Sequence, residues 1–366
     1  MKNSLQDSLI NIYPLLTSKI TNSDSLFKII NIAQKLPNVN VISDVMFESN
    51  LTKGESTTDI SIVFDKLNRH LIIDSFPSLL NLANKSNPWK KFESLIQKWI
   101  EEGSSVYNNV EHIWLEFDTG AKDDSGLEPS LFFYPLPSSS KYNKPFSNFA
   151  RYEWIICDVI ELLMDDCISM LTRQNLQKCF DLLPENSEVF DVGVMLPRVS
   201  ESKLVRLCIR GIKTSEIIEY LYSIGWNGSI EEMCHLLNEL STLTDSILIS
   251  ISVGDDINSR IGLECYIDKK PQSIHRWQMF FDFMIKKKLC TFDQASEIMS
   301  WPGHMQEKSC QEVWPSNNSN ILSNAVKIST RVINHVKIVY QPKLEAKAYL
   351  RLSHYSVEYD ALQQEA

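Results

Sequence analysis

The 366-residue sequence predicts an α+β protein in which a ten-stranded antiparallel β-barrel is ringed by helices. Two helical segments followed by two strands recur five times along the chain, in units of about 70 residues. Strands that follow one another pair as antiparallel hairpins, which need no crossover helix. Each strand is apolar on one face, which suits a closed barrel with its helices outside. Two separate α+β sandwiches, or a half-open sheet, remain as alternatives.

Helical spacing and strand alternation define the first two units. Apolar residues alternate from Ile60 to Phe64, as in a strand that buries one face. A later helix carries Trp89 and Trp99 on one side and ends at Gly103, a residue typical of helix C-termini. The expected elements are helices at 5–17, around 26–33 and at 89–99, and strands at 39–47, 58–65, 112–118 and 130–134.

The other three units carry helix start and stop signals. One helix ends at Gly225, and Ser229 with Glu232 forms a plausible capping box for the next. Thr291 and Gln294 open a short helix near the C-terminal end. The expected helices span 148–164, 172–183, 215–224, 230–240 and 274–287, and the expected strands span 189–196, 204–210, 246–253, 261–267, 335–341 and 346–353.

One segment stands apart from these units. Residues 301–322 contain Pro302, Gly303, Pro315 and a run of Ser and Asn, so we expect a long polar loop, either a lid or a plain excursion. No boundary leaves both sides with a core of their own. The sequence therefore predicts a single domain over 1–366.

Composition excludes several classes of protein. The net charge of -10 argues against a nucleic-acid or anionic-membrane surface. No uncharged apolar run is long enough to span a membrane, and the first residues lack the features of a signal peptide. The eight cysteines stand singly, without a CxxC pair, which favours reduced thiols. We therefore expect a cytoplasmic protein.

Motifs for metals and nucleotides are absent from the sequence. The aspartate pairs at 123, 165 and 255 do not complete a DDxxD motif, and neither GxxxxGK[ST] nor GxGxxG occurs. The pair Cys234–His235 has no further ligands nearby, so no metal site is expected.

The strand faces opposite the apolar ones are expected to line the lumen, and they are polar. Bare charges cannot lie unpaired in a dry interior, so we expect the lumen to be wet or filled by a ligand. The expected lumen residues are Trp114, Glu116, Asp118, Asp191, Gly193, Met195, Arg206, Cys208, Arg210, Ser250, Ser252, Glu264, Tyr266, His335, Lys337, Lys347, Tyr349 and Arg351.

Five such units around such a lumen resemble the aromatic prenyltransferases of the ABBA architecture, the PT-barrel family, which includes indole, dimethylallyl-tryptophan and cyanobactin-peptide enzymes. In that family inward Arg and Lys hold a diphosphate, and tyrosines screen the allyl cation, commonly as Lys-x-Tyr along a strand. Lys347-x-Tyr349-x-Arg351 matches this pattern and Arg206 with Arg210 matches it in part.

The match has a departure as well. Glu264-x-Tyr266 keeps the tyrosine but has a carboxylate where the family has a base, so the full pattern occurs once. The resemblance implies transfer of a dimethylallyl or geranyl group from its diphosphate to tryptophan, an indole or a peptide side chain, without magnesium or another cofactor. It assigns the diphosphate to five bases, the cation shield to three aromatic residues and the acceptor and final proton to one carboxylate. The diphosphate bases are Arg206, Arg210, Lys337, Lys347 and Arg351. The cation shield consists of Tyr266, Tyr349 and Trp114, and the carboxylate is Glu116.

Other interpretations of these residues stay open. Arg206, Arg210 and Lys347 could instead form salt bridges with Glu264, Asp118 or Asp191. The barrel could then belong to a non-catalytic binding or accessory protein of natural-product biosynthesis. An unrelated α+β enzyme with differently paired strands is the third possibility.

Overall fold

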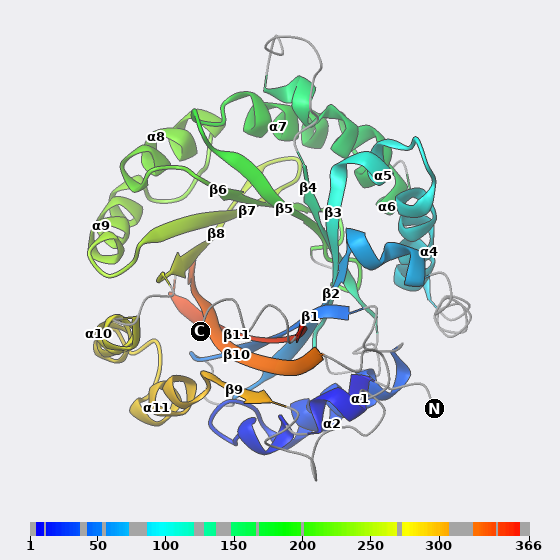
Figure 1. The fold of residues 1–366 in the computed structure, drawn as a ribbon. Coiled ribbons are helices and arrows are strands. Elements are labelled where there is room, and N and C mark those ends of the chain that lie inside the picture. Colours follow the sequence, from blue (N-terminus) through cyan, green and yellow to red (C-terminus); the bar gives the residue numbers. More distant parts are fainter. Residues whose placement is uncertain are drawn as a thin grey trace.

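The computed structural model describes residues 5–10, 12–36, 42–52, 56–72, 86–120, 128–136, 148–165, 168–198, 201–268, 273–306, 325–341 and 343–358. Along these residues two helices and two strands alternate five times, which confirms the predicted order. Figure 1 shows the strands as a ring with the helices around it.

The bounds of the elements follow the five units. The first two contain α1 (Leu5–Leu9), α2 (Ser23–Lys35), β1 (Ile42–Asn50), β2 (Thr58–Asp65), α4 (Asn87–Ile100), α5 (Ser105–Asn109), β3 (Val110–Phe117) and β4 (Ser130–Pro135). The third and fourth contain α6 (Glu161–Leu163), α7 (Met170–Asp181), β5 (Glu188–Val194), β6 (Val205–Arg210), α8 (Thr214–Ile224), α9 (Ile230–Ser241), β7 (Ser246–Val253) and β8 (Ile257–Tyr266). The fifth contains α10 (Ser273–Lys286), α11 (Phe292–Ser300), β9 (Gly303–Gln306), β10 (Ala325–Tyr340) and β11 (Glu345–Glu358).

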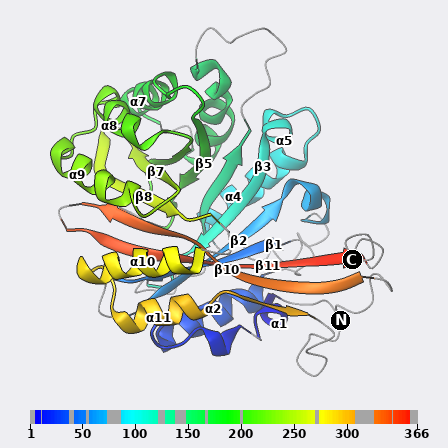
Figure 2. The ribbon, with the colours of Figure 1, turned by 60° about the vertical axis from the view of Figure 1, so that its left-hand side comes forward.

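Ten strands close into a ring. From β1 to β8 each strand pairs antiparallel with the next, β8 pairs with β10, β10 with β11, and β11 returns to β1. This confirms the closed barrel and excludes both the two separate sandwiches and the half-open sheet. An eleventh strand, β9, pairs with β10 at residues 328–331, beyond the stretch that β8 covers (Figure 2).

The hydrophobic core lies between the ring and the helices. Phe64 of β2 packs against Phe92 of α4, with ring centroids 5.7 Å apart. Trp89 of the same helix packs against Phe117 of β3 at 6.0 Å. Because side chains alternate along a strand, a face given to the helices leaves the opposite face for the lumen. The fold thereby places the polar residues of each strand inside the ring.

The segment 301–322 differs from the expected polar loop at its start. Trp301 is only 1% exposed, and its ring packs edge-on against Phe47 at 5.7 Å. The next residues form β9, Gly303–Gln306. Burial of the large Trp301 indole stabilises the start of this segment against the ring. This stabilisation outweighs the tendency of the neighbouring polar residues to form a loop. The rest of the expected loop, from residue 307, lies outside the described residues, and the single domain over 1–366 stays a prediction.

Two expected helices are interrupted. The helix expected at 5–17 is divided into α1 and a 3-10 turn, Tyr13–Leu15, because Pro14 has no N–H to continue an α-helix. The helix expected at 148–164 consists of a 3-10 turn, a π-helix over Ile155–Ile160 and the short α6. Both changes lie in the outer layer and leave the ring intact.

Three observations on the described residues bear on the expectations from composition. None of their helices has the length and apolar character that a membrane crossing requires. Their six cysteines are free thiols. Within the same ranges, no three His, Cys, Asp or Glu side chains gather in a way that could hold a metal ion.

Candidate functional site

Two adjoining cavities occupy the lumen, and we call them the basic and the aromatic compartment. The cavity volume is about 30 Å³ for the basic compartment and about 120 Å³ for the aromatic one. Residues that line both mark their junction: Glu116, Arg206, Lys337 and Tyr349. The bases of the basic compartment are Arg198, Arg206, Arg260, Lys337 and Lys347, and the aromatic compartment is walled by Trp114, Phe132, Phe190, Tyr266 and Tyr349.

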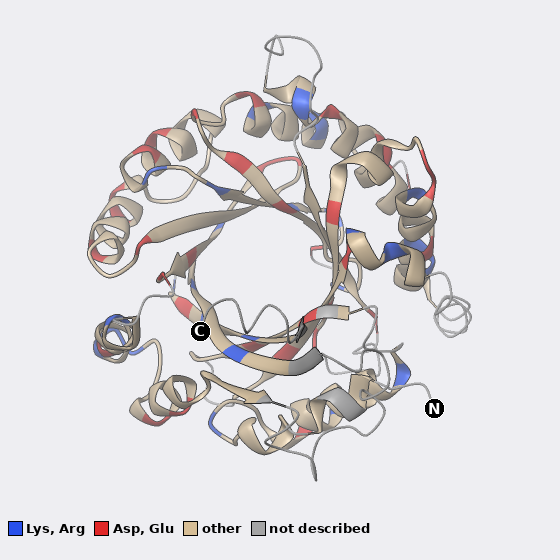
Figure 3. Ribbon diagram, viewed as in Figure 1, with Lys and Arg blue, Asp and Glu red and all other residues tan. Residues whose placement is uncertain are grey.

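Strand register brings residues far apart in sequence into one row across the lumen. Trp114 of β3 pairs with Phe132 of β4, which pairs with Gly193 of β5. Gly193 in turn pairs with Arg206 of β6, which pairs with Ser252 of β7. This row runs from the aromatic wall to the basic compartment. Figure 3 shows that acidic and basic positions occur along the strands of the ring as well as on the outer helices.

Two glycines make room for lumen side chains. A Cβ on Gly193 would lie 2.1 Å from a carbon of the Phe132 ring, so only glycine lets this ring lie across β5. A Cβ on Gly262 of β8 would lie 2.2 Å from Cε of Lys337. Lys337 therefore crosses over β8 and reaches the basic compartment.

β-Bulges add side chains to the aromatic compartment. The register shifts between Val189 and Asp191 on β5, and both Phe190 and Asp191 line the cavity. A second shift on β10 does the same for Asn334 and His335. A bulge allows two consecutive residues to face one side, which regular alternation forbids.

The structure brings together most of the predicted site residues. Glu116, Trp114, Tyr266 and Tyr349 all line the aromatic compartment, together with Arg206 and Lys337; Lys347 lines the basic one. Arg210 and Arg351 line neither compartment. Arg210 lies over the rings of Tyr134 and Phe190, and Arg351 binds Asp44 on β1.

Each predicted diphosphate base already has a carboxylate partner. Lys337 Nζ lies 3.1 Å from Glu264, and Arg206 lies 2.9 Å from Glu201. Lys347 binds Glu48. The remaining pairs join Arg210 with Glu188 and Arg351 with Asp44. The salt-bridge partners expected for Arg206, Arg210 and Lys347 were therefore wrong, because a loop carboxylate, Glu201, and two carboxylates on neighbouring strands, Glu188 and Glu48, lie closer to these bases.

One carboxylate, Glu201, lies among three arginines. Its oxygens lie 2.9 Å from Arg206, 3.7 Å from Arg198 and 3.6 Å from Arg260. Arg198 also binds Glu116 at 2.7 Å. Arginine forks match the oxygens of carboxylates and phosphates alike. The three guanidinium groups thus form a place where an anion binds, and Glu201 fills it.

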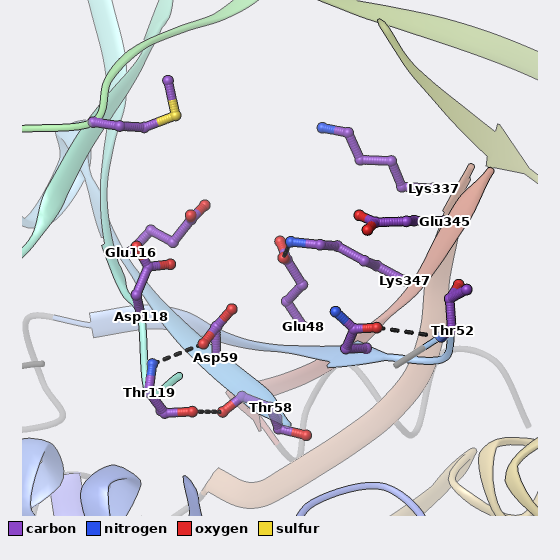
Figure 4. Close-up of polar contacts among 12 residues, drawn as sticks. Glu48, Thr52, Thr58, Asp59, Glu116, Asp118, Thr119, Lys337, Glu345 and Lys347 are labelled. Carbon is purple, nitrogen blue, oxygen red and sulfur yellow. Dashed lines mark hydrogen bonds and ion pairs between the residues drawn. The ribbon is translucent and has the colours of Figure 1, made fainter. Parts of the chain in front are cut away.

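Glu48, Lys347 and Asp59 show how burial acts on the lumen (Figure 4). Burial alone would raise the pKa of Glu48, but the charge and hydrogen bond of Lys347 lower it to about 2. Asp59 lies opposite Glu48 in the β1–β2 register and accepts a hydrogen bond from Thr119 N at 2.7 Å. Burial and the Glu48 charge raise the pKa of Asp59 to about 7. Glu48 is therefore charged at neutral pH, whereas Asp59 gains its charge only as the pH passes through neutrality.

Three rings stack along one wall of the aromatic compartment. His335 lies between Tyr349, with centroids 4.1 Å apart, and Tyr266, at 4.8 Å. Burial lowers the pKa of His335 to about 4, so this ring is neutral at pH 7. Burial also holds the pKa of both phenols well above the ordinary value. The wall is uncharged and aromatic, as a surface that screens a cation requires.

Sequence analysis missed four charged residues of the basic compartment and its surroundings. Arg198 and Glu201 lie in the connection between β5 and β6, where strand alternation gives no direction. Arg260 precedes the residue at which the strand was expected to begin, and Glu48 follows the residue at which β1 was expected to end. The alternation from Asp44 through Glu48 was the available signal for the last of these.

The solved structures to which this chain is similar include a 6-dimethylallyltryptophan synthase, AnaPT and NotF. The 6-dimethylallyltryptophan synthase from Micromonospora olivasterospora, in complex with DMASPP and Trp, superposes with a TM-score of 0.54 at 12% identity over 95% of this chain and 97% of that one. AnaPT from Neosartorya fischeri gives 0.52 at 11% identity over 97% and 93%. NotF, in complex with brevianamide F and DMSPP, gives 0.51 at 13% identity over 98% and 96%. The chain therefore has the fold of the ABBA indole prenyltransferases, which confirms the predicted PT barrel.

Sequence comparisons add little to this. No family model matches the chain. A curated relative, the Kelch repeat and BTB domain-containing protein 1 of Camelpox virus (strain CMS), is 27% identical over 148 residues. The match covers 36% of this chain and 26% of that protein, so the chain spans about a quarter of its length.

Proposed function

We propose that this protein is a prenyltransferase that moves a dimethylallyl or geranyl group from its diphosphate to an aromatic acceptor, which is tryptophan, an indole or a peptide side chain, in the cytoplasm. The observation that carries the proposal is the junction of the basic and aromatic compartments at Glu116, Arg206, Lys337 and Tyr349. A diphosphate in the basic compartment has its allylic carbon at this junction, next to an acceptor in the aromatic one. The shared fold supports the same function.

The diphosphate takes the place that Glu201 fills in the unliganded protein. A diphosphate carries more charge than one carboxylate and offers more oxygens to Arg198, Arg206 and Arg260. Lys337 and Lys347 complete the cradle from β10 and β11. The arginines that Glu201 releases bind the leaving group directly, and Lys337 and Lys347 add donors beside it, so these side chains take the part that a metal ion has in other isoprenoid enzymes.

In the proposed reaction the bond between the allylic carbon and the diphosphate oxygen breaks, and its electron pair leaves with the diphosphate. Tyr349 and Tyr266 screen the allyl cation from water. A ring carbon of the acceptor supplies the electron pair for the new C–C bond and then loses its proton to Glu116. Burial raises the pKa of Glu116 above its ordinary value, although Arg198 opposes this, and a higher pKa suits a proton acceptor.

Binding of a non-hydrolysable dimethylallyl thiodiphosphate tests the cradle. Arg206 and Arg210 are matched, since both lie on β6 with carboxylate partners, but only Arg206 lines the basic compartment. We expect the analogue, with EDTA present, to raise the melting temperature of the wild type and of Arg210→Gln. Arg206→Gln should bind at least about tenfold more weakly, a loss of about 1.4 kcal/mol. Glu201→Gln should bind more tightly, because the internal competitor is gone.

Equal binding by Arg206→Gln and Arg210→Gln contradicts the proposed cradle. Binding of the analogue to Glu201→Gln with the affinity of the wild type contradicts it as well. Product formation is then followed by mass spectrometry, with dimethylallyl diphosphate and a panel of indoles and indole-containing peptides. A mass gain on the acceptor confirms transfer.

A non-catalytic binding protein is the second candidate. One observation favours it: each of the five predicted bases has a carboxylate partner without any ligand present. A lumen that neutralises itself has less need of a diphosphate. Binding of aromatic ligands without binding of the thiodiphosphate, and without product, would support this candidate over the transferase.

A further inference from the structure

Asp191 is a carboxylate of the aromatic compartment that the proposed chemistry does not use. The other two acidic residues of this compartment have cationic partners: Glu116 binds Arg198, and Glu264 binds Lys337. Oδ1 of Asp191 is buried and has no hydrogen-bond partner among the described residues. A buried polar atom without a partner costs free energy unless a ligand or water satisfies it.

The position of Asp191 makes it available to a ligand. The bulge on β5 turns both Asp191 and Phe190 toward the cavity, and Asp191 pairs with Cys208 on β6. The walls around it are the rings of Trp114, Phe132 and Tyr266. Aromatic faces and a carboxylate together are the chemistry that recognises an ammonium group.

The charge of the compartment points to the same kind of ligand. Its lining contains three carboxylates, Glu116, Asp191 and Glu264, against two bases, Arg206 and Lys337. His335 is neutral at pH 7, since burial lowers its pKa to about 4. Glu116 and Glu264 match the two bases, so Asp191 is the acid left over: once it is ionised a cationic ligand restores the balance, whereas a carboxylate on the ligand adds a further negative charge.

We propose that the aromatic compartment binds an aromatic ligand that carries a cationic nitrogen, and that the Asp191 carboxylate forms an ion pair with this nitrogen. Ligands that carry a carboxylate bind more weakly. Under the proposed function, on which this assignment of a substrate class rests, the ligand is the acceptor. An aromatic amine, or an aromatic side chain of a peptide next to an amine, then fits better than a free amino acid.

Ligand binding should also release a proton. Burial and the charge of Glu264 hold the pKa of Asp191 well above its ordinary value, with Glu116 acting in the same direction and Lys337 opposing. The remaining titratable groups of this lining are Arg206, Cys208, Tyr266 and Tyr349, apart from the neutral His335. An ammonium group favours the ionised carboxyl, so Asp191 loses its proton as the ligand binds.

Calorimetric titration with three indoles tests the proposal: tryptamine, the neutral indole-3-ethanol and the anionic indole-3-propionate. We expect tryptamine to bind at least about tenfold more tightly than the other two. Asp191→Asn should reduce this preference to about twofold or less. Since the neutral acid and the amide have nearly the same shape, this variant should keep the wild-type melting temperature. Glu188→Gln, on the same strand but paired with Arg210 outside the compartment, should keep the preference.

Titrations in two buffers with different ionisation enthalpies should show proton release with tryptamine in the wild type and not in Asp191→Asn. Equal affinities for the three indoles, a preference that survives in Asp191→Asn, or no binding of any of them overturns the proposal. None of these measurements includes a diphosphate, so their outcome is separate from that of the transferase test. If the thiodiphosphate does not bind but the preference for tryptamine depends on Asp191, the transferase proposal fails, and the protein is a barrel that binds cationic aromatic ligands.

Discussion

At the scale of single residues, Asp59 belongs to a cluster of acidic residues in the lumen, and its ionisation is disfavoured there. Its neighbours include Glu48 across the β1–β2 register, Glu116 on β3 and Asp118, the residue that follows β3 (Figure 4). Burial and the Glu48 charge raise its pKa from 3.8 to about 7. A carboxyl with a raised pKa stabilises the fold below its unfolded-state pKa, and this contribution is lost as the pH rises through the folded-state pKa.

We therefore expect Asp59→Asn to be more stable than the wild type at pH 8, by on the order of a few kcal/mol, and close to it at pH 4. Asparagine keeps the oxygen that accepts the hydrogen bond from Thr119 N. Urea unfolding at a series of pH values measures the difference between the two proteins. Parallel stability profiles for wild type and variant between pH 4 and pH 8 would contradict the raised pKa.

Most of the inward residues could be predicted at this scale, but their partners could not. Alternation along a strand fixes the face of Glu116, Lys337 and Tyr349 once the helix side is known. It says nothing about the loop carboxylate Glu201 or about Arg198, which reach the lumen from a connection. Ion pairs between distant segments depend on the register of the strands and on the path of the loops. Neither can be inferred from the residues that lie nearby in the sequence.

At the scale of elements, β5 is shaped by a glycine and a bulge. Gly193 pairs with Phe132 of β4 and leaves space for its ring, while the bulge turns Asp191 into the compartment. Alternation predicted that Asp191 and Gly193 face the lumen, but it could not predict Phe190 beside them or the space that Gly193 leaves for the ring, because a bulge breaks the two-residue period and a glycine has no side chain to place. β5 therefore sets both the wall and the charge of the aromatic compartment.

Gly193→Ala should destabilise the protein by about 1–3 kcal/mol, because its Cβ would overlap the ring of Phe132. The double variant Gly193→Ala with Phe132→Leu should recover part of this loss, since a smaller side chain relieves the overlap. Gly120→Ala is the matched control, as a Cβ there meets nothing within 4 Å. Thermal unfolding of the four proteins measures these effects. Equal losses at Gly193 and Gly120 would show that the overlap does not matter.

At the scale of the whole molecule, the helix–helix–strand–strand repetition was enough to predict the barrel. The five pairs of strands leave one consistent closure, in which β11 meets β1. The sequence did not show β9, or that β10 begins at Ala325, because the polar residues around these strands are typical of a loop. The order of the elements was thus predictable, and the extension of the last hairpin beyond the ring was not.

A closed ring with one continuous core should unfold as a unit. Differential scanning calorimetry is expected to show a single transition, with calorimetric and van't Hoff enthalpies in agreement. Removing any strand pair would open the ring and expose the apolar face that the helices cover, so no part of the ring has an independent core. Two resolved transitions would contradict the prediction of a single domain over 1–366.

The pairing of β1 with β11 has a consequence for biosynthesis. On the ribosome, β1 emerges about 300 residues before its last partner, which at about 5–20 residues per second leaves its free edge waiting for about 15–60 s. During that time the edge can pair with other nascent chains. Its inward residues Asp44 and Glu48, which later bind Arg351 and Lys347, are then unpaired acids. Repulsion between these acids on neighbouring polypeptides discourages aggregation until β11 emerges and pairs with β1.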